Sequence, residues 1–179
     1  AFDLGDSDMD LILKWVKDVQ IKWGVDEECT LKWSPVPLNE NTWRAGIERL
    51  LLGYALPARE ERLFGGVLPY DNIEGGETTV LGGLLSFLDL LFETLKGLET
   101  PRTLGERSDY LAAVLADLFK PGEDSDIELQ VLRRVIAELQ RIQELSGFCR
   151  AVDMALIRWY LGKNLAQEGF GFGFMTGGV

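Results

Sequence analysis

Acidic side chains beside glycines are the first feature of this sequence that could do chemistry. Asp71, Glu74 and Glu77 fall within seven positions of one another, next to Gly75 and Gly76. Carboxylate oxygens are the ligands that hard divalent cations prefer. The spacing matches no EF-hand, however, and carboxylates at turns and helix starts also act as caps. Metal binding and a structural loop role both stay open here, and the prediction is that the chain holds no metal.

Tryptophans and arginines form the second group of candidate contact residues. Trp15, Trp43 and Trp159 lie in apolar helical patterns, which predicts that they belong to the core. Tryptophans on an irregular stretch can instead stack on unpaired bases, and arginines can contact phosphates. The residues predicted to make a weak contact with DNA or a partner are Trp23, Trp33, Arg44, Arg49, Arg59 and Arg62.

Several kinds of active site are excluded by residue type. The chain contains no histidine, so it has no Ser-His-Asp triad, no imidazole base and no HExxH zinc site. The glycines of 169–173 are followed by no Lys-Ser or Lys-Thr pair and no helix, which excludes a P-loop. Cys29 and Cys149 form no CxxC motif, so reduced thiols in a cytoplasmic protein are expected, although a disulfide between them stays open.

Charge and composition narrow the class of protein further. The 179 residues carry 18 Lys and Arg against 29 Asp and Glu, a net charge of -11, which is the wrong sign for a freestanding nucleic-acid-binding domain. No run of about 18 uninterrupted apolar residues is present, and the N-terminus lacks the basic and apolar regions of a signal peptide. A soluble globular domain without a membrane span is therefore expected.

The elements that must position these residues are helices. Apolar side chains recur at helical spacing in six segments, and no segment alternates convincingly as a strand, so the predicted fold class is all-α. The six helices are expected at about 8–20, 42–56, 77–96, 103–120, 125–146 and 151–166. Thr103 with Glu106 and Ser125 with Glu128 fit the capping-box pattern. An irregular connection is expected over 21–38, where Pro35 and Pro37 prevent a helix.

Two further expectations concern glycine-rich parts of the chain. The long connection 58–76 is apolar enough to predict an ordered loop that packs on the helices. Gly82 and Gly83 interrupt the most apolar helix, which predicts close approach of another backbone there. Residues 1–168 are expected to form one helical domain, and 169–179 to begin a strand of a downstream domain.

Five ordered strings resemble the RecC family, which forms the gamma chain of bacterial exodeoxyribonuclease V. They span nearly the whole chain, and one of them is 15 residues long, which makes the resemblance more specific than any single short motif. The strings are WGVD at 23–26, NTWRAGIERLLLGYA at 41–55, GVLPYDNIEG at 66–75, LGGLLSFLD at 81–89 and GFMTGGV at 173–179.

The resemblance implies a fold and a role. It implies a noncatalytic segment similar in position to the helical insertion in the second RecA-like half of a superfamily 1 helicase. The parent RecBCD machine unwinds and degrades double-stranded DNA ends during recombinational repair in the bacterial cytoplasm. RecB-like and RecD-like subunits are the implied partners. They bring the ATP and magnesium chemistry, and no cofactor is expected in this segment.

Two alternatives from other functional classes stay open. The chain could be a protein-interaction module of a helicase-like scaffold, with no direct DNA contact. It could also be an unrelated helical enzyme that works through carboxylates, although its acidic residues cluster at helix starts and in loops rather than at one convergent site.

Overall fold

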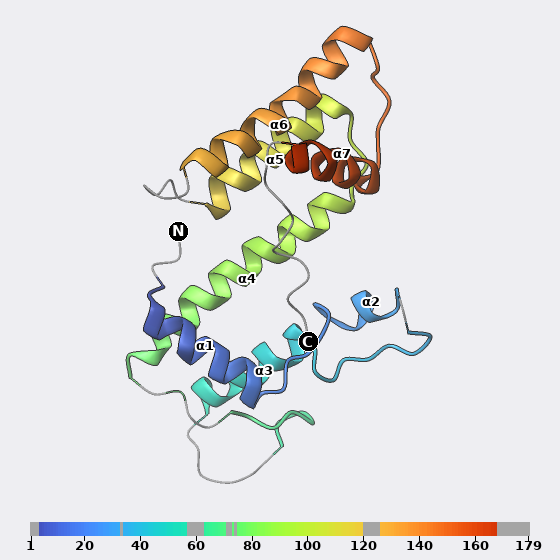
Figure 1. The fold of residues 1–179 in the computed structure, drawn as a ribbon. Coiled ribbons are helices and arrows are strands. Elements are labelled where there is room, and N and C mark those ends of the chain that lie inside the picture. Colours follow the sequence, from blue (N-terminus) through green and yellow to red (C-terminus); the bar gives the residue numbers. More distant parts are fainter. Residues whose placement is uncertain are drawn as a thin grey trace. The chain divides into compact units, whose positions relative to one another are not determined.

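The computed structural model describes residues 4–32, 34–56, 63–70, 73, 75–119 and 126–167. Within these residues the protein is all-helical, with two isolated β-bridges and no strand, which confirms the predicted class (Figure 1). The chain divides into two compact units, Phe2–Phe92 and Glu93–Val179. The helices are α1 (Asp6–Asp18), α2 (Glu27–Thr30), α3 (Trp43–Ala55), α4 (Glu77–Glu99), α5 (Leu104–Leu118), α6 (Asp126–Ser146) and α7 (Met154–Gln167).

Trp15 on α1 lies in the core of the N-terminal unit and is 0% exposed. Helical spacing places Ile12 and Val19 on the same face of α1, and Trp43 of α3 packs partly buried against this core. These positions confirm the core prediction for Trp15 and Trp43. The other buried members of the cluster are Leu50, Tyr70, Ile73, Leu81, Leu84 and Leu88.

The connection before α4 is ordered where it meets the helices. Tyr70 and Ile73 are buried in the N-terminal core, which confirms the predicted apolar loop at these two residues. The Tyr70 hydroxyl donates to Asp18 Oδ2 at 2.8 Å, across 52 residues of sequence. Gly53 of α3 lies against the Tyr70 backbone, where an added Cβ would stand 2.5 Å from the carbonyl carbon. A side chain at position 53 would therefore push the loop away.

α5 and α6 form the centre of the C-terminal unit and run antiparallel side by side. The Ser108 hydroxyl donates to the Ile136 carbonyl at 3.0 Å, and the Gly105 N–H donates to Gln143 Oε1 at 2.9 Å. α7 packs on α6. The buried apolar residues of this unit's core cluster are Leu104, Leu111, Leu115, Ile136, Leu139, Val152 and Ile157.

The predicted cap of α5 is confirmed. The Thr103 hydroxyl accepts from the Glu106 N–H at 3.3 Å, and Glu106 Oε2 accepts from the Thr103 N–H at 2.9 Å, as a capping box requires. Gly147, with φ of 66°, follows the end of α6 as expected for a left-handed residue after a helix. The second predicted capping box begins at Ser125, which lies outside the described residues.

Three details of the prediction are wrong. The 21–38 stretch contains the short helix α2, because Asp26 accepts from the Cys29 N–H at 3.0 Å and caps a single turn before the prolines. Trp159 is 62% exposed rather than buried in the core. The predicted close approach is wrong at Gly82, where an added Cβ would meet no atom within 4 Å. Another backbone does approach a helical glycine closely at Gly53.

One helix in the described part of the chain is long and apolar enough to cross a membrane by length and composition. This is α4, whose most apolar 18-residue window has a mean hydropathy of 1.4. The core helix of a soluble protein passes the same test, so the match is weak evidence. Leu81, Leu84 and Leu88 of α4 are buried in the N-terminal core.

Candidate functional site

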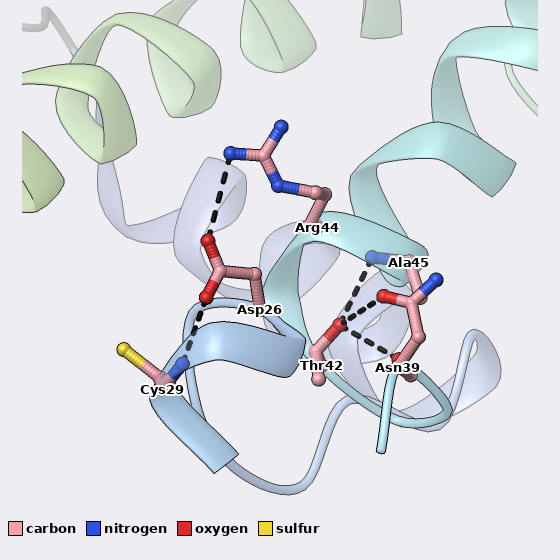
Figure 2. Close-up of polar contacts among 6 residues, drawn as sticks. All are labelled: Asp26, Cys29, Asn39, Thr42, Arg44 and Ala45. Carbon is pink, nitrogen blue, oxygen red and sulfur yellow. Dashed lines mark hydrogen bonds and ion pairs between the residues drawn. The ribbon is translucent and has the colours of Figure 1, made fainter. Parts of the chain in front are cut away.

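Arg44 lies in the first turn of α3 and reaches back to Asp26 at the start of α2. Figure 2 shows the guanidinium facing this carboxylate, with Nη2 at 3.7 Å from Oδ2. The Arg44 side chain is 70% exposed, so the pair contributes at most about 1 kcal/mol. The other Asp26 oxygen accepts from the Cys29 N–H. Asp26 therefore caps α2 and also offsets the charge of Arg44.

The start of α3 is fixed by a buried threonine (Figure 2). Thr42, which is 0% exposed, accepts from the Ala45 N–H at 3.2 Å and donates to the Asn39 carbonyl at 2.8 Å. The backbone N–H of Arg44 donates to the Val25 carbonyl at 2.9 Å. These bonds hold the first turn of α3 against the segment that carries Asp26, so the backbone beneath Arg44 is well positioned.

Arg49 joins three segments of the N-terminal unit. Its Nε donates to the Leu68 carbonyl at 2.9 Å, and its Nη1 donates to the Val19 carbonyl at 3.2 Å. Its own carbonyl accepts from the Tyr70 N–H at 2.9 Å. The side chain therefore links α3 to the loop before α4 and to the end of α1, and two of its donors are occupied by the protein itself.

A hollow of about 440 Å³ lies beside Arg49. Glu40 and Glu48 line it, and their carboxylates form no hydrogen bond or ion pair within the described residues. Their negative charges oppose the binding of a phosphate to the partly occupied guanidinium. The residues that line the hollow are Val19, Gln20, Asn39, Glu40, Asn41, Ala45, Glu48, Arg49, Gly66, Val67 and Leu68.

The structure describes one of the remaining predicted contact residues, Trp23. Trp23 is exposed, with a relative accessibility of 39%. Trp33, Arg59 and Arg62 lie outside the described residues. Asp71 and Glu74 of the candidate metal group also lie outside them, and Glu77 begins α4. Among the described residues, no three His, Cys, Asp or Glu side chains gather as a metal site. Both cysteines are free.

Sequence reasoning missed a cluster of donors at the C-terminal end of α4. Arg107 is 0% exposed and donates to the carbonyls of Leu98 at 3.2 Å and Thr100 at 2.9 Å. Arg102 donates to the Gly97 carbonyl and stacks over the Tyr110 ring, 4.1 Å from its centroid. The Tyr110 hydroxyl in turn donates to the Thr94 carbonyl at 2.9 Å. Together these side chains cap the last carbonyls of α4, where positive charge is favoured.

Burial governs the electrostatics of this cluster. It lowers the pKa of Arg107 from its usual value, and the positive charge of Arg102 lowers it further. The two carbonyl acceptors offset the cost of removing the guanidinium from water. One signal in the sequence pointed to this arginine: Arg107 occupies the apolar stripe of α5 between Leu104 and Leu111, where a solvated cation is not expected.

Comparison with known proteins gives a consistent family across nearly the whole chain. Residues 1–169 match the family described as RecBCD enzyme subunit RecC fourth domain. The chain is 29% identical over 182 residues to RecBCD enzyme subunit RecC of Escherichia coli (strain K12), which covers 99% of this chain and 16% of that protein. It is 30% identical over 177 residues to the same-named subunit of Mycolicibacterium smegmatis, with 98% and 16% covered.

A third relative extends the match to another bacterium. RecBCD enzyme subunit RecC of Haemophilus influenzae is 27% identical over 178 residues, which covers 99% of this chain and 15% of that protein. The chain therefore spans about a sixth of the length of these curated relatives. The resemblance predicted from the five sequence strings is confirmed.

Proposed function

Since this chain belongs to the RecC family, whose fourth domain its residues 1–169 match, we propose that it is a noncatalytic structural domain of a RecC-type subunit. The parent RecBCD enzyme is then an ATP-dependent exodeoxyribonuclease that unwinds and degrades double-stranded DNA ends for recombinational repair in the bacterial cytoplasm. RecB-like and RecD-like subunits are the proposed partners, and ATP and magnesium act through those other subunits.

One observation carries the structural role: the best-positioned cations of the described residues donate to backbone carbonyls of the chain itself. Arg49 joins α1, α3 and the loop before α4, and Arg102 and Arg107 cap the end of α4. A guanidinium held in this way fixes the geometry of the domain and has fewer donors left for a substrate phosphate. Such cross-links suit a domain whose contribution is a rigid shape.

Assembly of the complex can be separated from its chemistry by one matched pair of variants. In the full-length subunit, Arg107→Met should lower the yield of complex with partner subunits, because it loosens the end of α4. Each complex that does form should unwind DNA at the unchanged rate. Arg141→Met is the control, since Arg141 is an exposed arginine that pairs with Glu138 on the surface of α6. Reduced unwinding per assembled complex at normal yield would contradict the proposal.

A second candidate function is a protein-interaction module without direct DNA contact. The specific observation that favours it is the state of the two described arginines of the predicted contact group. Arg44 pairs with Asp26, Arg49 is tied to two carbonyls, and the hollow beside Arg49 presents Glu40 and Glu48. With a net charge of -11, these features suit a protein surface better than a phosphate backbone.

The finer placement of the chain belongs to the same proposal. We propose that its helices correspond to the helical insertion of the second RecA-like half of a superfamily 1 helicase. Residues 1–168 then act as the helical part, and 169–179 lead into a strand of the next domain. Residues 168–179 lie outside those the structure describes, so the strand stays a prediction from sequence.

A further inference from the structure

The outward face of α7 is apolar and positively charged. Leu156 is 49% exposed and Trp159 is 62% exposed, one helical turn apart. Lys163 follows Trp159 by one further turn and holds its Nζ 5.2 Å from the centroid of the indole. Arg158 is also exposed, but at two positions from Leu156 it lies on another side of the helix. We define Leu156, Trp159 and Lys163 as the α7 face.

The opposite side of α7 is already occupied. Ile157 is buried in the core of the C-terminal unit, and Met154, Tyr160 and Leu161 pack against that core partly buried. α7 is thus apolar both where it packs and where it is exposed. Helices with apolar residues all round are normally covered on all sides, so the exposed side indicates a second contact.

The charge of α7 sets it apart from the rest of the chain. Its sequence, MALIRWYLGKNLAQ, contains two cations and no Asp or Glu, whereas each of the other helices α1 to α6 contains at least one acidic residue. In a chain with a net charge of -11, the helix itself is a local positive region, although one carboxylate, Asp153, caps its start by accepting from the Leu156 N–H at 2.9 Å. A surface that covers it should offer apolar side chains bordered by carboxylates.

The small area of the α7 face indicates that it binds another part of the same polypeptide and not a separate subunit. Two apolar side chains expose on the order of 200 Å² together, well below the roughly 800 Å² per partner of a stable interface between independent proteins. A covalently joined surface needs far less contact, because its effective concentration is about millimolar for short connections. The curated relatives are about six times as long as this chain, so most of their length lies outside it.

We propose that the α7 face is the docking surface for an acidic, apolar surface elsewhere in the same full-length subunit, with Trp159 as its central anchor. This inference rests on the proposed function, namely that the chain is one domain of a longer subunit. Trp and Arg are the residues most often found as energetic hot spots of interfaces. An unpaired base is a poorer occupant, because Lys163 already stands over the Trp159 ring and stacking needs an open face.

Hydroxyl-radical footprinting, read by mass spectrometry, tests the occupant directly. In this chain alone Trp159 should oxidise fast and Trp15, which is 0% exposed, slowly. In the full-length subunit without partners, Trp159 oxidation should fall by at least about tenfold, because docking closes the surface. Equal rates in the two proteins would overturn the proposal. Protection that arises only with partner subunits, or only with single-stranded DNA, would overturn it as well.

A variant measures the same contact by another route. In the full-length subunit, Trp159→Ala should raise amide exchange over α7 by about thirtyfold, the effect of truncating a central tryptophan anchor. Lys163→Glu should raise it less, and Leu145→Ala, at a more exposed position on α6, should leave it unchanged. In this chain alone, Trp159→Ala should not change the unfolding midpoint, which separates docking from folding.

The docking inference and the proposed function can be contradicted separately. If Trp159 stays reactive in the full-length subunit while Arg107→Met still lowers complex yield, only the docking inference is lost. If complex yield is unaffected and unwinding per complex falls, the structural role itself is contradicted.

Discussion

The N-terminal unit joins distant parts of the sequence through one half-buried arginine, whereas the C-terminal unit buries an arginine against a helix end close to it in sequence. Arg49 donates to carbonyls 19 and 30 residues away, at Leu68 and Val19. Arg107 donates to carbonyls 9 and 7 residues away, at Leu98 and Thr100. Arg49 and Arg107 therefore both act as cross-links within the protein.

The two kinds of arginine cross-link follow from the way each unit is built. The N-terminal unit packs α1, α3 and α4 around a loop that must be tied down, so its cross-links run between segments. The C-terminal unit rests on the antiparallel pair α5 and α6, which bonds from Ser108 and Gly105 join, and its arginine and tyrosine cross-links fix where α4 ends and α5 begins. The N-terminal unit should therefore depend on its loop, and the junction of α4 and α5 should depend on its caps.

The largest expected effect separates the two units by their cores. Trp15→Ala should cost about 3–5 kcal/mol and Leu139→Ala about 2–5 kcal/mol, because both side chains are buried and leave cavities. Amide exchange should rise mainly over α1 and α3 in the first variant, and mainly over α5 and α6 in the second. An equal rise in amide exchange in both units after either substitution would show that the two cores do not unfold separately.

Arg107→Met should cost about 2 kcal/mol. The partly buried Leu98 carbonyl loses its donor, at about 1–3 kcal/mol for a group left unpaired, whereas the exposed Thr100 carbonyl keeps a bond from Arg102 at 3.3 Å. Removal of a desolvated charge offsets part of this cost. Arg107→Lys should fall between the two proteins, because one ammonium cannot reproduce both guanidinium bonds. Urea unfolding gives the free energies, and exchange at the end of α4 gives the location. An Arg107→Met variant as stable as the parent protein would show that Arg107 does not stabilise the end of α4.

Two helical glycines differ in their surroundings: Gly53 lies against the Tyr70 backbone, and Gly82 has no neighbouring atom within 4 Å. Gly53→Ala should cost about 1–3 kcal/mol, since its Cβ would press on the Tyr70 backbone. Gly82→Ala should gain about 1 kcal/mol, because position 82 is a helix interior with nothing within 4 Å of the new methyl group. Thermal unfolding of the two variants measures both. A gain in stability for Gly53→Ala would show that the loop does not pack against α3.

The smallest effect concerns pH and the cap of α5. Hydrogen bonds from the Thr103 N–H and hydroxyl lower the pKa of Glu106 below its usual value of 4.5. A lowered carboxylate pKa stabilises the folded state above pH 4.5, and this contribution is lost as the pH falls below that value. Glu106→Gln should therefore lower the unfolding midpoint slightly at neutral pH and flatten its dependence on pH in the acid range. Identical pH profiles would contradict the cap.

The sequence predicted the C-terminal unit and α4 better than the N-terminal connections, because their signals are local. The apolar stripe of α4 and the Thr103 cap lie within one or two turns of the residues they organise. α2 was missed because a single turn has no periodicity. The tie from Arg49 was missed because it requires Leu68 and Val19 to be brought together by the fold.

The candidate contact residues show a second limit of sequence reasoning. An apolar residue on a helix that is apolar all round carries no sign of which side it faces, so Trp159 was assigned to the core although it is exposed. Arg44 and Arg49 are both tied to other parts of the chain. Their partners, Asp26 and two backbone carbonyls, depend on tertiary contacts that no spacing rule supplies.

DNA binding by the chain alone tests the central claim, that its arginines serve structure before substrate. A titration with single- and double-stranded DNA at low salt, repeated at higher salt, should give dissociation constants no tighter than about 10⁻⁴ to 10⁻⁶ M, and weaker with added salt. Arg44→Gln should change this little, because Asp26 already offsets part of the charge of Arg44. Sub-micromolar binding that is insensitive to salt would contradict the claim and point to a dedicated site, with exposed Trp23 the first residue to replace.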